Sequence, residues 1–433
     1  MSISLSIAST SPWTGLLAGL GTAAVGWALW PGRNAVRLAP PLILIAGAML
    51  ILKGSIWPRF VSTPSWPNLS AILSLTQMAW VCVLVIWFAR RHSRRAGTGT
   101  VVFVLIVGFT SSAMVVWATP DPAIDVMRFH DQATAVLMEG GNPYTDIEVQ
   151  EDYRPEKIVH GYVYPPVPLL SFTASAIVGL DVRYATLAAW AAALAILGTA
   201  ALRSSDRTTS VGILILLAAQ PEWPGILILG WTEPLALLWL TVGLLCIRSR
   251  PFLSAVAIGL AVASKQYYIA VLPMFITMRW HFRWRRIGLI LLAAAATVAP
   301  FAIRSPAGFI DATIGYVADL PVRTDTANLI GWLDFLGIQF TPSKWMAPLA
   351  ASAVAAFAGK NAATIRHPIV GVGVTLGVVF FLGTQALEGY WFLVLWIVAI
   401  AFIVDDHPAR DNSDGSSDEP LNGDESSTRT QCS

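Results

Sequence analysis

The segment Asp125-Val-Met-Arg-Phe-His-Asp131 is followed by Glu139-Gly-Gly-Asn-Pro-Tyr144 and Tyr162-Val-Tyr-Pro-Pro166, and together they form a stretch rich in carboxylates and tyrosines. Long apolar runs flank this stretch along the chain. Acids at the edge of a bilayer are costly unless they cap a helix, form a pair or carry out chemistry. The stretch therefore predicts a polar loop with a specific task, set between hydrophobic helices.

The rest of the chain has the composition of a membrane protein. Of its 433 residues 55% are hydrophobic and 12% are charged, and the mean hydropathy of +0.63 is far above that of a soluble domain. Apolar runs of roughly 17 to 25 residues, long enough to span a bilayer, recur from Trp13 almost to Val404. We therefore predict an all-α, polytopic membrane protein that resides in the cell membrane.

Charge and cysteine content exclude several other classes. The net charge of +2 is spread over the loops, and no basic run carries interleaved aromatics outside the short inner loops, so we expect no nucleic-acid partner. The three cysteines, Cys82, Cys246 and Cys432, are too few and too scattered for a disulfide framework or a metal site. We expect neither a metal nor a cofactor.

Apolar runs and the distribution of Lys and Arg together predict about thirteen spans, with the N-terminus outside and the C-terminus inside. The strongest inner markers are the arginines of residues 90–95 and 279–286. With this topology, every acidic residue before Asp405 except Asp206 falls on the outer side. The expected spans lie near residues 13–30, 38–57, 69–89, 100–119, 184–202, 209–222, 233–247, 252–264, 267–279, 286–303, 345–358, 368–384 and 389–404.

This topology divides the chain into three parts. Residues 1–99 form accessory transmembrane helices, residues 100–404 form the main membrane domain with its outer loop at 120–183, and residues 405–433 form a disordered cytoplasmic tail. The run after Pro165 and Pro166 must lie along the membrane or re-enter it, because a crossing there would put the later Arg-rich loops on mixed sides.

Residues 125–139 predict an amphipathic helix at the membrane surface. Phe129, Ala133, Val136 and Leu137 form one apolar stripe. Asp125 stands at the head of this helix, where partial burial would make its carboxylate more basic. Such an Asp can also be an N-cap or an ion-pair partner of Arg128.

Other polar residues of the loop allow two interpretations. Asp121 can share the site of Asp125 or act as a cap, and His130 is expected at the surface because it and Asp131 face different sides of a helix. Tyr144, Tyr162 and Tyr164 can cradle a sugar, although aromatic residues are common at membrane interfaces.

Asp125, the helix ending in Gly140-Gly-Asn-Pro-Tyr144, and Tyr162-Val-Tyr-Pro-Pro166 resemble the first outer loop of GT-C-fold glycosyltransferases of the family 87 type. The resemblance extends more weakly to Trp231-Thr-Glu-Pro234, Lys265-Gln-Tyr-Tyr268 and Gln385-Ala-Leu-Glu-Gly-Tyr-Trp391. It covers roughly residues 100 to 404. Members of this family transfer mannose or arabinofuranose from a polyprenyl phosphate to glycolipids and glycans of the cell envelope.

The resemblance implies a fold, a reaction and partners. It implies a GT-C fold with interfacial helices in the outer loop, an inverting transfer at the outer membrane face, and Asp125 as the general base. The partners would be a polyprenyl-phospho-sugar donor, a glycolipid or polysaccharide acceptor and the lipid bilayer. No phosphate loop for a nucleotide sugar is apparent in the sequence, which favours a lipid-linked donor.

The leaving phosphate requires a cation. Candidate residues can be assigned both to this phosphate and to the rest of the substrate. Lys265 is the first choice, although a Lys at a span end can also be a snorkelling anchor, and Arg304 and Arg323 follow it. For the substrate we expect contacts from acids and an amide at outer span ends, in addition to the residues of the outer loop. The candidate substrate residues are Asp121, Tyr144, Tyr162, Tyr164, Glu233, Gln266 and Glu388.

Two other functions stay open at this stage. A carrier or flippase would move a lipid-linked sugar without making bonds, but its usual marks, ionisable residues midway along spans and paired broken helices, are poorly represented. A degenerate site in a partner subunit is the third alternative.

Overall fold

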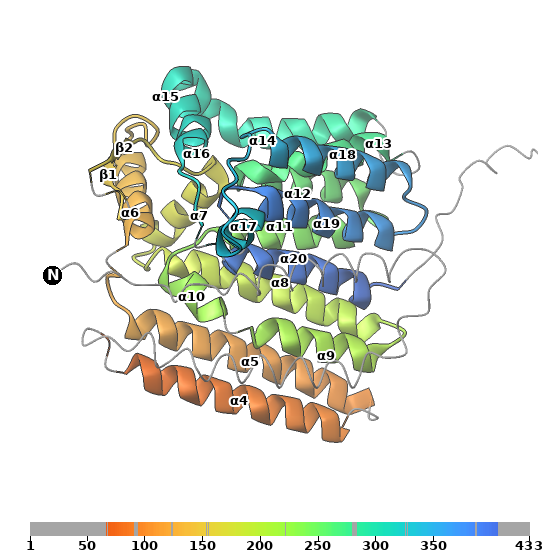
Figure 1. The fold of residues 1–433 in the computed structure, drawn as a ribbon. Helices are drawn as coiled ribbons and strands as arrows, with labels where there is room; N and C mark the ends of the chain where they lie inside the picture. Colours follow the sequence, from red (N-terminus) through yellow and green to blue (C-terminus); the bar gives the residue numbers. More distant parts are fainter. Residues whose placement is uncertain are drawn as a thin grey trace, which may run out of the picture.

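The computed structural model describes residues 66–405, apart from residues 67, 91–93, 123, 153, 155, 221, 279–283, 325, 327, 386 and 387. The described part is mostly helical, with little strand. Its long helices lie side by side in one bundle, and shorter elements gather at one end of it (Figure 1). The expected spans at 13–30 and 38–57, and the tail beyond Asp405, lie outside the described residues.

The helices and strands follow in chain order. They are α4 (Leu69–Arg90), α5 (Arg94–Ala118), α6 (Asp125–Met138), β1 (Glu148–Gln150), β2 (Ile158–His160), α7 (Pro166–Ile177), α8 (Arg183–Arg203), α9 (Arg207–Ala218), α10 (Glu222–Ile228), α11 (Glu233–Leu245), α12 (Pro251–Val262), the 3₁₀ helix η2 (Gln266–Val271), α13 (Leu272–Thr277), α14 (Trp284–Arg304), α15 (Pro306–Ile310), the π-helix η3 (Asp311–Gly315), α16 (Tyr316–Asp319), α17 (Leu329–Phe335), α18 (Met346–Lys360), α19 (Arg366–Leu382) and α20 (Glu388–Ile403).

Four of the described helices are long and apolar enough to cross a membrane. They are Leu69–Ala89, Gly97–Ala118, Arg183–Arg203 and Trp284–Arg304, and the bent pair α9–α10 would add a fifth. The other expected spans within the described part fall on apolar helices of 10–17 residues. The chain is thus a helical protein with several helices fit to span a membrane, and the number of thirteen crossings stays a prediction.

Tight helix contacts hold the bundle together. Gly108 of α5 faces the buried Trp190 of α8, and a Cβ at Gly108 would lie 2.7 Å from the indole ring. Trp190 in turn stacks on Trp223 of α10, with ring centroids 4.4 Å apart. A glycine therefore allows α5 to approach α8 closely, and large aromatics fill the space beside this contact.

The outer-loop segment forms a small layer at one end of the bundle. Helix α6, the hairpin β1–β2, α15 and α16 lie together there, whereas α5 begins and α8 ends at the opposite end (Figure 1). The two strands are antiparallel, with Val149 opposite Val159. A second cluster of buried apolar residues, separate from the bundle core, joins this layer to α14 through Phe129, Tyr144 and Phe301.

The local structure of this layer agrees with several sequence expectations. Helix α6 ends at Met138, and Gly140 follows with φ +79°, a left-handed conformation that suits glycine. Pro166 stands in the first turn of α7. Helix α7 has 12 residues, the same length as α9 and α12, so its course along the membrane stays a prediction.

Helix α6 buries more than the single apolar stripe expected from the sequence. Phe129 and Ala133 are buried as expected, but Met127, His130 and Thr134 are buried as well. Helix α6 packs against α7 and β1, so its buried surface is wider than a stripe that faces lipid on one side. The predicted surface position of His130 is therefore wrong, because the helix is enclosed from two directions.

Candidate functional site

Asp125 is the first residue of α6 and is half-buried. The N-cap position belongs to Ile124, and Arg128 pairs with Asp152, so Asp125 is neither the cap nor the partner of Arg128. Its Oδ1 accepts a hydrogen bond from the Val126 N–H at 2.7 Å, and its Oδ2 accepts one from the Asp152 N–H at 3.2 Å. The carboxylate is thus held in one orientation by two backbone donors.

The surroundings of Asp125 favour its protonated form. Burial raises the pKa of the Asp125 carboxyl above its usual range, and the Asp152 carboxylate adds to this effect. The two backbone hydrogen bonds and the Arg128 guanidinium oppose it. The carboxylate is consequently a stronger base than an ordinary surface Asp.

Tyr164 lies beside a cation from a distant part of the chain. Lys265 Nζ lies 4.9 Å from the centroid of the Tyr164 ring. Burial holds the pKa of Tyr164 well above its usual range, so the hydroxyl stays protonated, and the Asp125 carboxylate is among the charges that add to this effect. Tyr164 is therefore a neighbour of Lys265 within electrostatic range of Asp125.

Lys265 is buried beside Glu233. Lys265 Nζ donates to Glu233 Oε1 at 2.7 Å, and the two side chains are 8% and 1% exposed. Burial alone would lower the pKa of Lys265, but the Glu233 carboxylate outweighs this effect and the pKa is raised. Lys265 stays charged inside the protein, so it is not an anchor that snorkels to water.

Aromatic rings and unsatisfied oxygens surround this ion pair. Besides Tyr164, the rings of Tyr267 and Tyr390 lie 5.9 Å and 5.6 Å from Lys265 Nζ. The second oxygen of Glu233, Oε2, and the Thr232 hydroxyl are buried and make no hydrogen bond with any described residue. Buried oxygens of this kind are usually satisfied by water or a ligand.

The two arginine candidates for the donor phosphate occupy different places. Arg323 lies within electrostatic range of the Tyr390 hydroxyl, so it and Lys265 share a neighbour. Arg304 is exposed, and its Nη1 donates to the carbonyls of Gly140 and Gly141 at 2.9 Å and 3.1 Å. Among the described residues, Arg304 thus holds the turn after α6, and Arg323 is the arginine near the Lys265 pair.

Tyr144, Tyr162 and Gln266 hold the layer together in this structure. The Tyr144 hydroxyl donates to the Tyr164 carbonyl at 3.0 Å, and its side chain is buried. The Gln266 amide donates to the carbonyls of Val163 and Thr313 at 2.8 Å and 3.1 Å. These side chains fix the backbone around Tyr164, and direct contact with a substrate stays an untested prediction for them.

His130 links α6 to the break between α10 and α11. Its Nε2 lies 2.9 Å from the Gly230 carbonyl and its Nδ1 lies 3.1 Å from the Tyr162 hydroxyl. Because a carbonyl can only accept, Nε2 carries the proton and Nδ1 accepts from Tyr162. Burial lowers the pKa of His130 to about 3, with a further contribution from the Lys265 charge. His130 is therefore a neutral structural bridge.

Asp121 belongs to a different group of charges. It is exposed, with φ 47°, and lies within electrostatic range of Asp131. Asp181 is also near Asp131 and forms a 2.5 Å ion pair with the buried Arg183. Burial raises the pKa of Asp131, and Asp181 adds to the effect. This group lies beside α6 but is centred on Arg183 and not on Lys265.

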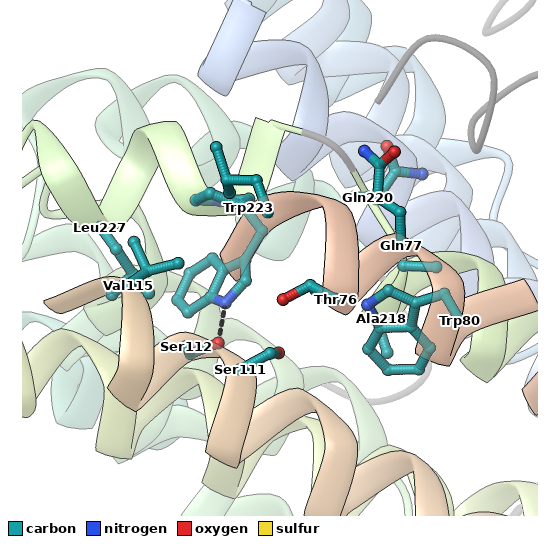
Figure 2. A pocket seen from close by; sticks show the side chains of 13 residues that line it. Thr76, Gln77, Trp80, Ser111, Ser112, Val115, Ala218, Gln220, Trp223 and Leu227 are labelled. Carbon is teal, nitrogen blue, oxygen red and sulfur yellow. Dashed lines mark hydrogen bonds between the residues drawn. The ribbon is translucent and has the colours of Figure 1, made fainter. Parts of the chain in front are cut away.

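A small cavity lies elsewhere, between α4, α5 and the bent pair α9–α10 (Figure 2). Its volume is about 30 Å³, which is room for very few water molecules. Gln77 and Gln220 line it, and the Trp223 indole donates to the Ser112 hydroxyl at 2.6 Å on its wall. No candidate site residue lines this cavity. Within the described ranges, no group of three or more His, Cys, Asp or Glu could hold a metal ion.

Four further residues complete the site; the sequence named Arg128 only as a possible partner of Asp125 and did not single out Asp152, Tyr267 or Tyr390. Arg128 and Asp152 contact Asp125 or its partner directly, whereas Tyr267 and Tyr390 surround Lys265. Both tyrosines stand in segments already noted in the sequence. Each follows a charged residue, Lys265 or Glu388, by two positions, and this spacing was the available signal. The side chain of Glu388 lies outside the described residues.

The fold and the site define a class, a largely helical protein with several helices that could cross a membrane and a polar site at one end of its bundle. Comparison with models of known protein families gives no match, and comparison with curated proteins gives none.

Proposed function

We propose that the protein is a membrane glycosyltransferase with a GT-C fold of about thirteen spans, which transfers mannose or arabinofuranose from a polyprenyl phosphate. The acceptor would be a glycolipid or polysaccharide of the cell envelope, and the site would face the outer side of the membrane. The observation that carries the proposal is that the Lys265 ammonium group lies 4.9 Å from the centroid of the Tyr164 ring, while the Asp125 carboxylate lies within electrostatic range of the same tyrosine.

The reaction needs a base on one side of the reacting carbon. As an acceptor hydroxyl attacks the anomeric carbon of the donor, it must lose its proton, and a carboxylate within hydrogen-bond reach can take it. Asp125 fits this role because its two oxygens are fixed by backbone N–H groups and each keeps a free lone pair. The raised pKa of Asp125 makes it a better proton acceptor.

The reaction also needs a cation on the side of the leaving group. The bond from the anomeric carbon to the phosphate oxygen breaks with its electron pair, and the resulting charge on the lipid phosphate must be stabilised. Lys265 uses one of its three N–H donors on Glu233, which leaves two for a phosphate. Arg323, near the same Tyr390 ring, would add the positive charge that the Lys265–Glu233 pair lacks.

Glu233 fits a role in holding the sugar. Its Oε2 is buried and accepts no hydrogen bond from a described residue, so it can accept one from a sugar hydroxyl. The rings of Tyr164, Tyr267 and Tyr390 around Lys265 would shield the charged groups from water. Attack and departure on opposite sides of the anomeric carbon would invert its configuration.

The test is transfer of labelled sugar from polyprenyl-phospho-mannose and, separately, polyprenyl-phospho-arabinose in membranes that contain the protein. We expect a labelled glycolipid or polymer from one donor, and a loss of about 10²-fold or more in Asp125→Asn at unchanged protein level. Asp131→Asn is the matched control, because this acid lies on the same helix but belongs to the Arg183 group.

Two results would overturn the proposal. Transfer by Asp125→Asn at the wild-type rate would remove the base. Accumulation of the lipid-linked sugar across sealed vesicles without any product would instead favour a carrier or flippase.

A further inference from the structure

The first turn of α6 is capped by a residue from a distant loop. The N-cap residue, Ile124, offers no side-chain acceptor to the helix. The Asp125 N–H instead donates to Asp152 Oδ2 at 2.7 Å, from the loop between β1 and β2. Asp152 thus supplies the cap that the local sequence lacks.

The contact between Asp125 and Asp152 is reciprocal. The Asp152 N–H donates back to Asp125 Oδ2 at 3.2 Å, while the Val126 N–H donates to Asp125 Oδ1 at 2.7 Å. One donor on each oxygen fixes the plane of the Asp125 carboxylate. A free carboxylate at a helix start would rotate, so the direction of Asp125 depends on Asp152.

Arg128 holds Asp152 in this position. Arg128 Nη2 lies 2.5 Å from Asp152 Oδ1 and donates to the Gln150 carbonyl at 2.8 Å. The two charged side chains are 41% and 42% exposed, and such pairs contribute little to overall stability. The role of this pair is therefore to hold Asp152 in place, and Asp152 in turn orients Asp125.

The other end of the loop is fastened to α16. Glu151, whose side chain is fully buried, forms a 2.5 Å ion pair with Arg154. Arg154 Nη1 also donates to the Asp319 carbonyl at 3.2 Å, and Lys157 Nζ lies 3.8 Å from Asp319 Oδ2. The loop is thus anchored on both sides, so Asp152 is held by more than its contact with α6.

We propose that Asp152, held by Arg128, is a positioning residue that fixes the direction and the electrostatic surroundings of the Asp125 carboxylate. The inference rests on the proposed function only in taking Asp125 as the base. Among the residues that the structure describes, the charged groups that act on Asp125 are Asp152 and Arg128, and Tyr164 is a further titratable group within electrostatic range.

The two partners act on Asp125 with opposite sign. The Asp152 carboxylate raises the pKa of Asp125, because two negative charges repel, and the Arg128 guanidinium lowers it. Removal of the charge of Asp152 should therefore lower the pKa of Asp125, and removal of the charge of Arg128 should raise it. A residue with a purely structural role would not give shifts in opposite directions.

The test follows protonation of Asp125 without any enzyme assay. Dicyclohexylcarbodiimide reacts with protonated carboxyl groups, so the labelling of Asp125 against pH, read by mass spectrometry, gives a midpoint. We expect the midpoint to move down in Asp152→Asn and up in Arg128→Gln, each by about 0.3 to 1 pH unit. Glu148→Gln, an exposed acid of the same hairpin that pairs with His160, is the matched control and should not move it.

Midpoints that stay unchanged, or that move in the same direction in both variants, would overturn the inference. If Asp152→Asn does not fold, a midpoint that stays unchanged in Arg128→Gln still overturns the inference. The sugar-transfer assay separates this claim from the proposed function. Opposite shifts in labelling without transfer by the wild type would sink the function alone, whereas transfer without such shifts would sink the positioning role alone.

Discussion

The buried His130 makes a definite prediction about the pH dependence of stability. In the folded protein its pKa is lowered to about 3, against an ordinary value of 6.5. The unfolded chain therefore binds a proton at His130 over a range in which the folded protein does not. His130 stabilises the fold fully above pH 6.5, and this contribution is lost as the pH falls toward 3.

The size of the effect follows from the two pKa values. Each pH unit within the range changes the free energy of unfolding by about 1.4 kcal/mol for one proton. Between pH 7 and pH 5 the contribution from His130 should fall by about 2 kcal/mol. The free-energy change at pH 5 depends little on the pKa of His130 in the folded protein, because a pKa near 3 lies well below the pH of the measurement.

His130→Gln removes the titration and keeps a donor for Gly230 and an acceptor for Tyr162. Unfolding in mixed detergent micelles, followed by tryptophan fluorescence, should show a smaller loss of stability from pH 7 to pH 5 in this variant than in the wild type. His160→Gln, at an exposed histidine of β2, is the control and should behave as the wild type. Equal losses in His130→Gln and the wild type would refute a buried, neutral His130.

The Lys265–Glu233 pair should behave as a coupled unit in the same unfolding assay: Glu233→Gln strands a buried cation and should cost about 3 to 5 kcal/mol. The double variant Glu233→Gln/Lys265→Met should be destabilised by at least about 2 kcal/mol less than the sum of the two single variants. Strictly additive costs would contradict a direct pair. Ser112→Ala leaves the buried Trp223 indole N–H without its acceptor and should destabilise by about 1 to 3 kcal/mol. Ser111→Ala, at the neighbouring hydroxyl that bonds only within α5, should cost less, and equal costs would argue against the Trp223 bond.

Much of the fold could be predicted from the sequence, because helix formation here follows local rules. Apolar runs gave the helices between residues 69 and 404, and Pro and Gly marked where α7 begins and α6 ends. Each of these signals acts within a few residues of its own position.

The site was harder to predict, because its contacts join distant segments. The inward position of His130 depends on Gly230, 100 residues away, and the apolar stripe of α6 carries no information about that partner. Asp152 was one of nine acids between Asp121 and Glu156, and only the hairpin brings it to the start of α6. Local periodicity gave the elements, whereas tertiary packing decided which polar residues meet.

Asp125 and Lys265 were singled out from the sequence; Lys265 lies beside the Tyr164 ring, and Asp125 lies within electrostatic range of the same tyrosine. Asp121 was considered for the same site, but its charge acts on Asp131 and is not among those that act on Asp125. The sequence could not separate these two acids, because both stand at the same edge of the membrane domain and only the path of the loop distinguishes them.

Separation of donor binding from transfer tests the central claim most directly. Binding of the polyprenyl-phospho-sugar and its transfer should be measured side by side in the wild type, Asp125→Asn and Lys265→Met. If Asp125 is the base and Lys265 binds the phosphate, Asp125→Asn should bind the donor within about 2-fold of the wild type and lose transfer by about 10²-fold or more. Lys265→Met should lose donor binding itself. Normal transfer by Asp125→Asn, or normal donor binding by Lys265→Met, would contradict the roles assigned to these residues.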